Sequence, residues 1–374
     1  MTHLSRWNYA AIPVPFVARF ALFALIAGCG AALIGYSQTA PSTPDSAQGQ
    51  PNPNANPQSI TIDVLVTDKS GENIRGLAAG DFTVLDNKQP IKLTGFRALD
   101  TKASPPDPVQ IVIVVDMINT GFTAVARERV ELEQFLKQDG GRLAHPTSIA
   151  ILAESGIKVE QGSTSDGNAL LAVLNKQGSE LRTVGRNTGF YGAAERLEMS
   201  LNQLGQLAGF EAKQPGRKMI LFISPGWPML TRSGDESDLK QRTWVFNTLV
   251  RLSNGLRDGH ITLYTLDPFD LGRTDPFYYQ AFLKPVAAIK NAEYPNLSLQ
   301  VLSEHSGGKV LIQGRDITGE LNEAVRDANA SYELTFAAAP GDRPDEYHAL
   351  QVLVDKPGAV VRTSAGYYAH TMER

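Results

Sequence analysis

The chain has a single cysteine, Cys29, and no cluster of lysine or arginine residues. Without a second cysteine no disulfide can form within the chain, so the folded part must be stabilised by its own core. The formal net charge is −4, and six scattered histidines add no basic footprint. Since binding to phosphate backbones needs clustered cations, we expect no nucleic-acid partner.

The signatures of several enzyme classes are also missing. A dinucleotide-binding sheet would carry Gly-x-Gly-x-x-Gly after its first strand, and only Gly121 stands in that region. The chain has no phosphate-binding loop of the Gly-x-x-x-x-Gly-Lys type, no Gly-x-Ser-x-Gly elbow and no His-Glu-x-x-His pair. We therefore predict a protein that is not an enzyme. An enzyme of unknown class stays an alternative, because catalytic residues can assemble from distant positions.

The amino terminus has the pattern of a targeting segment. Arg6 and Arg19 precede an uncharged, mostly apolar stretch over residues 20–36. Three outcomes are open: a lipobox-like Ile-Ala-Gly-Cys ending at Cys29 that would make it a lipid anchor, cleavage after Ser37, and an uncut membrane span. We expect residues 1–37 to be a signal peptide or a membrane or lipid anchor, and the protein to be exported to the periplasm or cell envelope.

Two short β segments are expected near the ends of the chain. Residues 38–58 are rich in Pro, Ser, Asn and Gln and are typical of a disordered linker. Apolar residues then alternate along residues 59–100, which indicates three half-buried strands and their turns. A similar pattern returns over residues 331–370. Neither piece is large enough to fold alone, so we predict that the two pair into one small all-β sandwich, with Ile62 and Val352 in the same core.

Residues 108–330, between these segments, alternate strands and helices. The strand candidates are 111–115, 148–152, 219–223, 261–266 and 309–312, with 156–159 as an antiparallel edge strand. Helices are indicated by apolar residues at i, i+4, i+7 and i+11 from Leu197 and from Val245. This alternation predicts an α/β domain with a doubly wound, mostly parallel, Rossmann-like sheet, inserted in the β sandwich.

The junction after the first of these strands is the candidate functional site. Residues 110–115 are almost entirely apolar, as in a strand covered on both faces, and stop at Asp116-Met-Ile-Asn-Thr120. Open α/β sheets bind their ligands at the carboxyl edge, and the loops starting at Asp116, Ser224 and Asp267 should meet there. The segment leading to Thr188 should reach the same edge.

These residues resemble the von Willebrand factor type A family. In that family an Asp-x-Ser-x-Ser motif, a loop threonine and a second aspartate form a metal-ion-dependent adhesion site. Asp116 matches the first aspartate, Thr120 the second hydroxyl and Thr188 the loop threonine. Ile118 replaces the first serine and Pro225 replaces the second aspartate, so the resemblance implies a degenerate site. In the alternative that keeps the metal, Asp116, Thr120 and Thr188 bind magnesium directly or through water.

The resemblance covers nearly all of the chain that follows the linker. Residues 64–96, the run Glu304-His-Ser-Gly-Gly-Lys309 and the stretch from Ser331 to Ala369 are similar to the von Willebrand type A-related proteins of acidobacteria. The function of that group is largely unassigned. For Asp116 the residues also allow a purely structural role, in which the carboxylate accepts hydrogen bonds and organises its loop as an Asx turn or helix cap.

A long aromatic and acidic loop, residues 267–279, should lie at the same edge. Its rings either anchor a partner or fold back as a satellite core, and its aspartates fit no known calcium loop. We predict a protein-binding face of the adhesion or envelope-assembly type, without cofactor and without a functional metal; magnesium-dependent binding is the alternative. The predicted partner-binding residues are Asn119, Trp227, Phe269, Phe277, Tyr278 and Tyr279.

Overall fold

A computed structural model describes residues 59–102, 109–159, 162–178, 189–228, 230, 238–267, 277–312, 316–339 and 341–369. All of them belong to one unit, residues 52–374. The predictions for the targeting segment, for Cys29 and for the linker lie outside the described residues, as do those for Thr188 and Phe269.

The central element is a mostly parallel, seven-stranded sheet of order β11-β10-β9-β5-β6-β7, with β8 paired to β6. Neighbours from β11 to β6 run parallel, whereas β7 and β8 pair antiparallel with β6. The predicted edge strand is therefore present as β7. The strands are β5 Val109–Asp116, β6 Arg142–Ala153, β7 Gly156–Val159, β8 Thr164–Asp166, β9 Arg217–Ile223, β10 Ile261–Leu266 and β11 Val310–Leu311.

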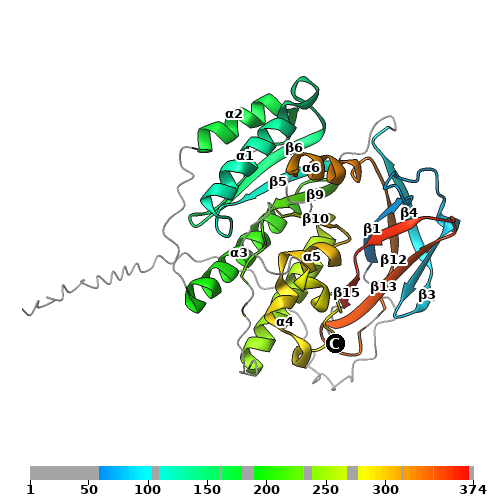
Figure 1. Ribbon diagram of the computed structural model, residues 1–374. Coiled ribbons are helices and arrows are strands. Elements are labelled where there is room, and N and C mark those ends of the chain that lie inside the picture. Colours follow the sequence, from blue (N-terminus) through cyan, green and yellow to red (C-terminus); the bar gives the residue numbers. More distant parts are fainter. Residues whose placement is uncertain are drawn as a thin grey trace, which may run out of the picture. The chain divides into compact units, whose positions relative to one another are not determined.

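Helices cover both faces of this sheet, which explains its unbroken apolar strands (Figure 1). Along β5, Val112 and Val114 face one hydrophobic cluster, and Ile111 and Ile113 face the other. The helices packed on the first cluster are α3 Phe190–Glu211, α4 Leu239–Asp258 and α5 Leu299–His305. Those on the second are α1 Phe122–Lys137, α2 Gly167–Gly178 and α6 Ile317–Arg326. The two predicted apolar stripes, from Leu197 and from Val245, are buried in α3 and α4.

The two ends of the described chain form two antiparallel sheets, β14-β1-β12-β4 and β15-β13-β2-β3. Strands from residues 59–100 pair with strands from residues 330–369 in both, as at Ile62 with Leu334 and Val352 with Val84. Ile62 and Val352 lie in one hydrophobic cluster. The strands are β1 Ser59–Thr67, β2 Phe82–Asp86, β3 Gln89–Ile91, β4 Leu93–Asp100, β12 Ala330–Ala337, β13 Glu346–Val354, β14 Val360–Thr363 and β15 Gly366–Ala369.

Tyr368 of β15 connects these sheets to the α/β part. Its ring belongs to the cluster under α3 and α4 and meets Phe246 edge-on at 5.8 Å between centroids. Asn254 of α4 donates from Nδ2 to the Tyr368 carbonyl oxygen at 3.1 Å and accepts the Tyr368 N–H at 3.3 Å. The side-chain amide of Asn254 thus pairs with β15 as a strand neighbour would.

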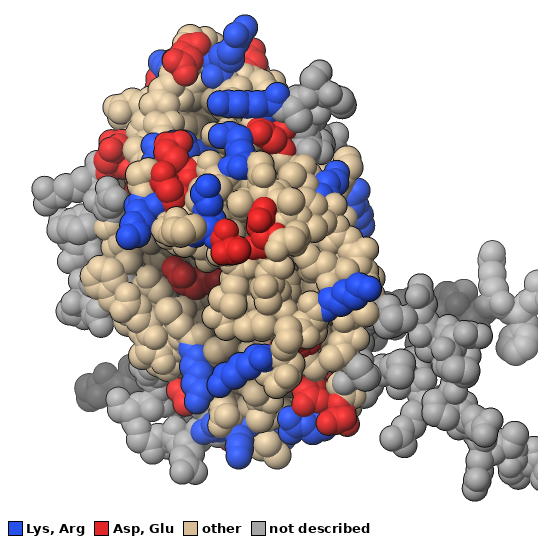
Figure 2. All heavy atoms as spheres, turned by 90° about the vertical axis from the view of Figure 1, so that its right-hand side faces the viewer, with Lys and Arg blue, Asp and Glu red and all other residues tan. Residues whose placement is uncertain are grey.

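Short 3-10 turns join the remaining elements: η1 Ala79–Asp81, η2 Gln138–Gly141, η3 Tyr278–Phe282, η4 Ile289–Asn291 and η5 Tyr294–Leu297. On the face of the molecule shown in Figure 2, cationic and acidic side chains are interspersed. That face therefore lacks the basic stripe that phosphate binding needs. Among the described helices, none combines the length and the apolar character needed to cross a membrane.

Candidate functional site

Three neighbouring parallel strands end in polar residues at the carboxyl edge of the central sheet. Asp116 is the last residue of β5, and Ser224 and Asp267 directly follow β9 and β10. The register pairs Val115 with Ile223 and Ile223 with Leu266, so the strands end side by side. All three polar residues are at most 5% exposed. The sequence prediction that these loops meet at one edge agrees with this arrangement.

Asp116 is held by four hydrogen bonds, two on each carboxylate oxygen. Oδ1 accepts the backbone N–H groups of Ile118 at 2.9 Å and Asn119 at 3.0 Å. Oδ2 accepts the Asn119 side-chain amide at 2.8 Å and the Ser224 hydroxyl at 2.6 Å. The first two bonds are those of an Asx turn, which organises the start of the loop. Asn119 Nδ2 also donates to Ser200 of α3 at 2.9 Å, so the turn is tied to a helix.

Burial raises the pKa of Asp116, and the hydrogen bonds from Ser224 and Asn119 oppose that rise. Desolvation disfavours the carboxylate, while the donors around it favour the charged form. The carboxylate thus depends on its hydrogen-bond donors. Removing one of them should be costly, because a charged group would be left underpaired in a fully buried position.

Ile118 and Pro225, the two residues that differ from the adhesion motif, make contacts within the protein. Ile118 is 2% exposed and belongs to the hydrophobic cluster under α3 and α4. The Pro225 carbonyl oxygen accepts the Gln300 side-chain amide at 3.2 Å. Thr120 is also buried, at 1% exposure. The described motif residues therefore do not fit a magnesium cage, since the one carboxylate already has donors on both oxygens and the neighbouring side chain is apolar.

Glu128 of α1 also lies near this edge, although the sequence predictions had not singled it out. It lies on α1, in the same buried stripe as Val125 and Leu132, and is 1% exposed. Neither carboxylate oxygen has a hydrogen-bond partner among the described residues. Burial raises its pKa well above the usual value, and the charges of Asp116 and Asp267 add to the rise. The available signal was a glutamate at i+3 from Val125 and i−4 from Leu132 on an apolar helix face.

The predicted partner-binding aromatics divide into buried and exposed residues. Trp227 is 3% exposed, and its indole N–H donates to the Leu297 carbonyl oxygen at 2.7 Å. Tyr279 is 5% exposed. Tyr278 is half-buried and donates to the Gln300 side chain at 3.0 Å, whereas Phe277 is 52% exposed. A partner could reach Phe277 and Tyr278 directly, but Trp227 and Tyr279 only after a rearrangement.

The described residues of this edge show no nucleophile and base that are paired and open to solvent. The hydroxyl of Ser224 is hydrogen-bonded to Asp116, but Ser224 is 0% exposed, so no substrate reaches it in this conformation. The side chains that contact Asp116 are an amide and a hydroxyl, and neither is a general base. Phe277 is exposed at this edge, whereas Asn119 is half-buried, with its amide nitrogen bonded to Asp116 and Ser200 and its side-chain oxygen buried.

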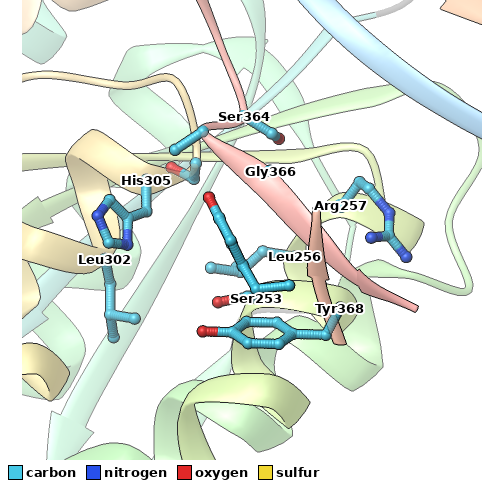
Figure 3. A pocket seen from close by; sticks show the side chains of 11 residues that line it. Ser253, Leu256, Arg257, Leu302, His305, Ser364, Gly366 and Tyr368 are labelled. Atoms are coloured by element: carbon cyan, nitrogen blue, oxygen red, sulfur yellow. The ribbon is translucent and has the colours of Figure 1, made fainter. Parts of the chain in front are cut away.

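A polar cavity lies between α4, α5, β13 and β15, away from this edge (Figure 3). Its volume is about 20 Å³, room for roughly one water molecule. Ser253, His305 and Ser364 line it, a combination that could suggest a hydrolase. However, the His305 ring bonds through Nε2 to the Leu283 carbonyl oxygen at 2.8 Å, and burial lowers its pKa. The ring is therefore engaged with backbone, and the cavity is too small for a substrate.

No family model matches this chain, and no curated protein matches it in sequence. Among solved structures it is similar to the VWA domain of SpRpn10, with a TM-score of 0.27 and 10% identity over 59% of this chain and 96% of that one. It is also similar to the TFIIH p34 N-terminal domain, with a TM-score of 0.24 and 16% identity over 53% of this chain and 97% of that one. Both likenesses are distant, and neither assigns a ligand or an activity to this chain.

Proposed function

We propose that this protein is an exported, non-enzymatic binding protein of the von Willebrand type A-related kind, which recognises a protein ligand at the carboxyl edge of its central sheet. The observation that carries the proposal is the Asp116 turn, whose four hydrogen bonds use both carboxylate oxygens. Such a turn gives the loop one fixed shape without a cation. Recognition then depends on shape, hydrogen bonds and aromatic contact.

Phe277 is the central contact residue in this proposal. An exposed aromatic ring beside hydrogen-bonding groups is typical of the residues that dominate protein interfaces. Tyr278 supplies a polar contact at its side, and Asn119 contributes the surface of the loop that its amide fixes to Asp116 and Ser200. Trp227 and Tyr279, both buried, support the loops from beneath. The proposal also includes Phe269 and Thr188, which the sequence predicts at this edge.

Site-specific photocrosslinking in the native cell envelope tests this assignment. A photoreactive residue at Phe277 should capture the same protein as one at Tyr278. The matched control is Leu353, which is 46% exposed on β13, and a photoreactive residue there should not capture that protein. Phe277→Asp should abolish capture from position 278. Equal capture from Leu353, or capture at position 278 that survives Phe277→Asp, would reject the edge as the binding face.

Magnesium-dependent binding at the same edge is a second candidate function. The observation in its favour is the buried carboxylate of Glu128, whose two oxygens have no hydrogen-bond partner among the described residues and which interacts with the charges of Asp116 and Asp267. A divalent cation beside Glu128 would offset this negative charge with water completing its shell, because Asp116, Glu128 and Asp267 are not a described group spaced closely enough to share an ion directly. Calorimetric titration with magnesium separates the candidates. No heat is expected; a heat that disappears in both Asp116→Ala and Glu128→Gln would favour the metal-dependent function instead.

The proposal extends to the organisation of the chain. The two four-stranded sheets would form one β-sandwich module around their shared cluster, with the α/β domain of residues 108–330 inserted in it. Residues 1–58 would tether this unit to the envelope, by a lipid on Cys29 or by an uncut span, or would release it after cleavage. Metabolic labelling with a radioactive fatty acid tests the lipid anchor, because a label on the protein that is absent from Cys29→Ser requires lipidation.

A further inference from the structure

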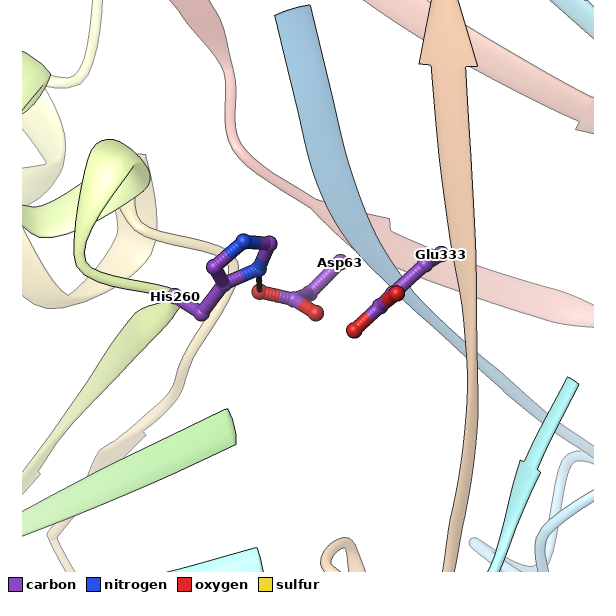
Figure 4. Close-up of side chains that lie close together, drawn as sticks. All are labelled: Asp63, His260 and Glu333. Carbon is purple, nitrogen blue, oxygen red and sulfur yellow. Dashed lines mark hydrogen bonds and ion pairs between the residues drawn. The ribbon is translucent and has the colours of Figure 1, made fainter. Parts of the chain in front are cut away.

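Three side chains with metal-ligand chemistry meet far from the carboxyl edge (Figure 4). Asp63 comes from β1 and Glu333 from β12, and His260 lies between α4 and β10, at the amino end of that strand. Each offers one ligand atom, and these atoms all lie within 4.8 Å of one another. In the sequence these residues stand far apart, and His260 is an isolated histidine.

The backbone holds the three side chains in place. Asp63 and Glu333 are directly paired in the register of β1 and β12, so their carboxylates project from the same face of the sheet. His260 has a left-handed backbone, with φ of 52°. Its N–H donates to the Arg257 carbonyl oxygen at 2.9 Å, and its carbonyl oxygen accepts the Lys218 N–H at 2.9 Å. The imidazole is thus presented from rigid elements, as a preformed site requires.

The hydrogen-bond partners of Asp63 and Glu333 leave one carboxylate oxygen of the cluster unsatisfied among the described residues. Two like charges directly opposite each other on paired strands are destabilising unless a positive group compensates. His260 Nδ1 lies 3.2 Å from Asp63 Oδ2, and Arg97 donates to both oxygens of Glu333 at 2.9 and 2.7 Å. The other oxygen of Asp63, Oδ1, is buried without a hydrogen-bond partner among the described residues. A cation between the carboxylates would satisfy that oxygen.

We propose that Asp63, His260 and Glu333 bind a divalent transition-metal cation, with zinc as the best match. One imidazole and two carboxylates form a ligand set that zinc accepts, whereas magnesium and calcium favour oxygen ligands alone. Three protein ligands leave a fourth, tetrahedral position for water. Tetrahedral zinc with bonds of about 2.0–2.2 Å holds its ligand atoms roughly 3.4 Å from each other. Small side-chain rotations provide that contraction from 4.8 Å.

Lys218 also acts electrostatically on Asp63 and His260, and the cation that a metal would displace is Arg97. It pairs with Glu333, which is 15% exposed at its side chain, but the arginine side chain itself is 55% exposed and can turn into solvent. The two carboxylates would neutralise the metal charge without it. The ligands come from the first β segment, the last β segment and the α/β part, so the metal would join three regions of the chain. Because the unfolded chain lacks this arrangement, metal binding should stabilise the folded state.

The full chain, without any histidine tag and stripped with a chelator, is titrated with zinc and with cobalt. One equivalent is expected to bind, and the melting temperature should rise by about 3 °C or more at saturating zinc. Cobalt should produce the visible absorption of a four-coordinate site with nitrogen and oxygen ligands. Magnesium at the same concentration should leave the melting temperature unchanged. Absence of any zinc-dependent shift would overturn the proposal.

Variants assign the site to these residues. His260→Asn and Glu333→Gln should each weaken zinc binding by roughly 10–100-fold or more. Loss of a hydrogen-bond partner of a metal ligand already costs that much, and these variants remove a ligand itself. Glu198→Gln, at an exposed position on α3, is the matched control and should bind as the wild type does. Zinc affinity unchanged in both ligand variants would place the metal elsewhere and reject the proposal.

Arg97→Gln gives an independent readout if a ligand variant fails to fold. Removing the competing cation should strengthen zinc binding severalfold, since Glu333 is then free to turn to the metal. An arginine with only a structural role would not change metal affinity in this direction. Unchanged or weaker binding in Arg97→Gln contradicts the proposal. The site lies at the opposite end of β10 from Asp267, so its failure would leave the proposed function untouched.

Discussion

At the scale of single residues, Asp116 illustrates how the same carboxylate can serve a metal or a loop. The motif around it suggests a cation, but its two oxygens take four donors from three residues. Which role it has depends on neighbours that are distant in sequence, such as Ser224. The sequence places Asp116 at the end of an apolar run, and the folded loop decides what the carboxylate contacts.

Ser224→Ala should destabilise the protein by about 1.5–3 kcal/mol, the range for a hydrogen bond to a charged group. The hydroxyl of Ser224 donates to buried Asp116 at 2.6 Å and accepts the Gly226 N–H at 2.9 Å. Ser70→Ala is the matched control, because Ser70 donates to Asp68 at the same 2.6 Å but in an exposed turn. It should cost much less than Ser224→Ala, because water can replace this bond in an exposed turn. Chemical denaturation measures both, and equal losses would contradict the importance of burial.

Glu128→Gln should stabilise the protein at neutral pH and not at pH 4. The raised pKa of Glu128 means that the folded state holds this proton more tightly than the unfolded state. Its contribution is fully present below the unfolded pKa of about 4.3 and is lost as pH rises through the folded value. Glutamine has no charge to bury, so the free energy of unfolding of the variant at pH 7 should be higher by on the order of 1–3 kcal/mol.

Denaturation curves at several pH values test this prediction, with Glu198→Gln on exposed α3 as the control that should show no such trend. A gain for Glu128→Gln that is the same at pH 4 and pH 7 would mean that ionisation of Glu128 is not involved.

At the scale of elements, periodicity predicted the central strands and the stripes of α3 and α4, because burial on one or two faces leaves a direct pattern in the sequence. The start of β6 left a weaker pattern. Residues 148–152 were predicted, and the strand begins at Arg142. Its first part buries Leu143, His145 and Thr147 on one face, so polar residues interrupt the apolar pattern. Tertiary contacts, not hydrophobicity, extend this strand.

Gly308→Ala should destabilise the contact between α5 and β10. A Cβ on Gly308 would overlap the Leu263 carbonyl oxygen of β10, so the backbone would have to shift, at a cost of roughly 1–3 kcal/mol. Gly209→Ala is the matched control, since nothing lies within 4 Å of a Cβ there and alanine favours the α3 helix by up to about 1 kcal/mol. Thermal unfolding should give shifts of opposite sign. Shifts of the same sign would show that close approach at Gly308 is not limiting.

At the scale of the whole molecule, the main long-range feature is the pairing of the two β segments. Thr61 and Thr335, 274 residues apart, form a hydrogen bond at 3.1 Å between β1 and β12. The sequence indicated that neither segment could bury its apolar face alone. Their register, such as Asp63 opposite Glu333, follows only from how the strands meet. The candidate metal cluster depends on that register and so could not be predicted.

Asn254→Ala should weaken the connection between these sheets and the α/β part. It would leave the N–H and carbonyl groups of Tyr368 and one donor of Arg257 without their partner, at a cost of about 2 kcal/mol or more. Asn175→Ala is the control, because Asn175 is exposed and accepts a hydrogen bond from Arg129. Urea unfolding with hydrogen exchange on β1 and β5 measures the effect. A loss confined to one region would show that the two regions unfold separately.

The sequence by itself determined the alternation of strands and helices, the mostly parallel sheet and the place of Asp116 at its edge. These follow from short-range periodicity, which records burial directly. Only the tertiary structure decided that Trp227 is buried while Phe277 is exposed, that Glu128 is buried near Asp116, and that Asp63, His260 and Glu333 meet. Those outcomes depend on contacts between residues far apart in the chain, and a linear pattern carries no record of them.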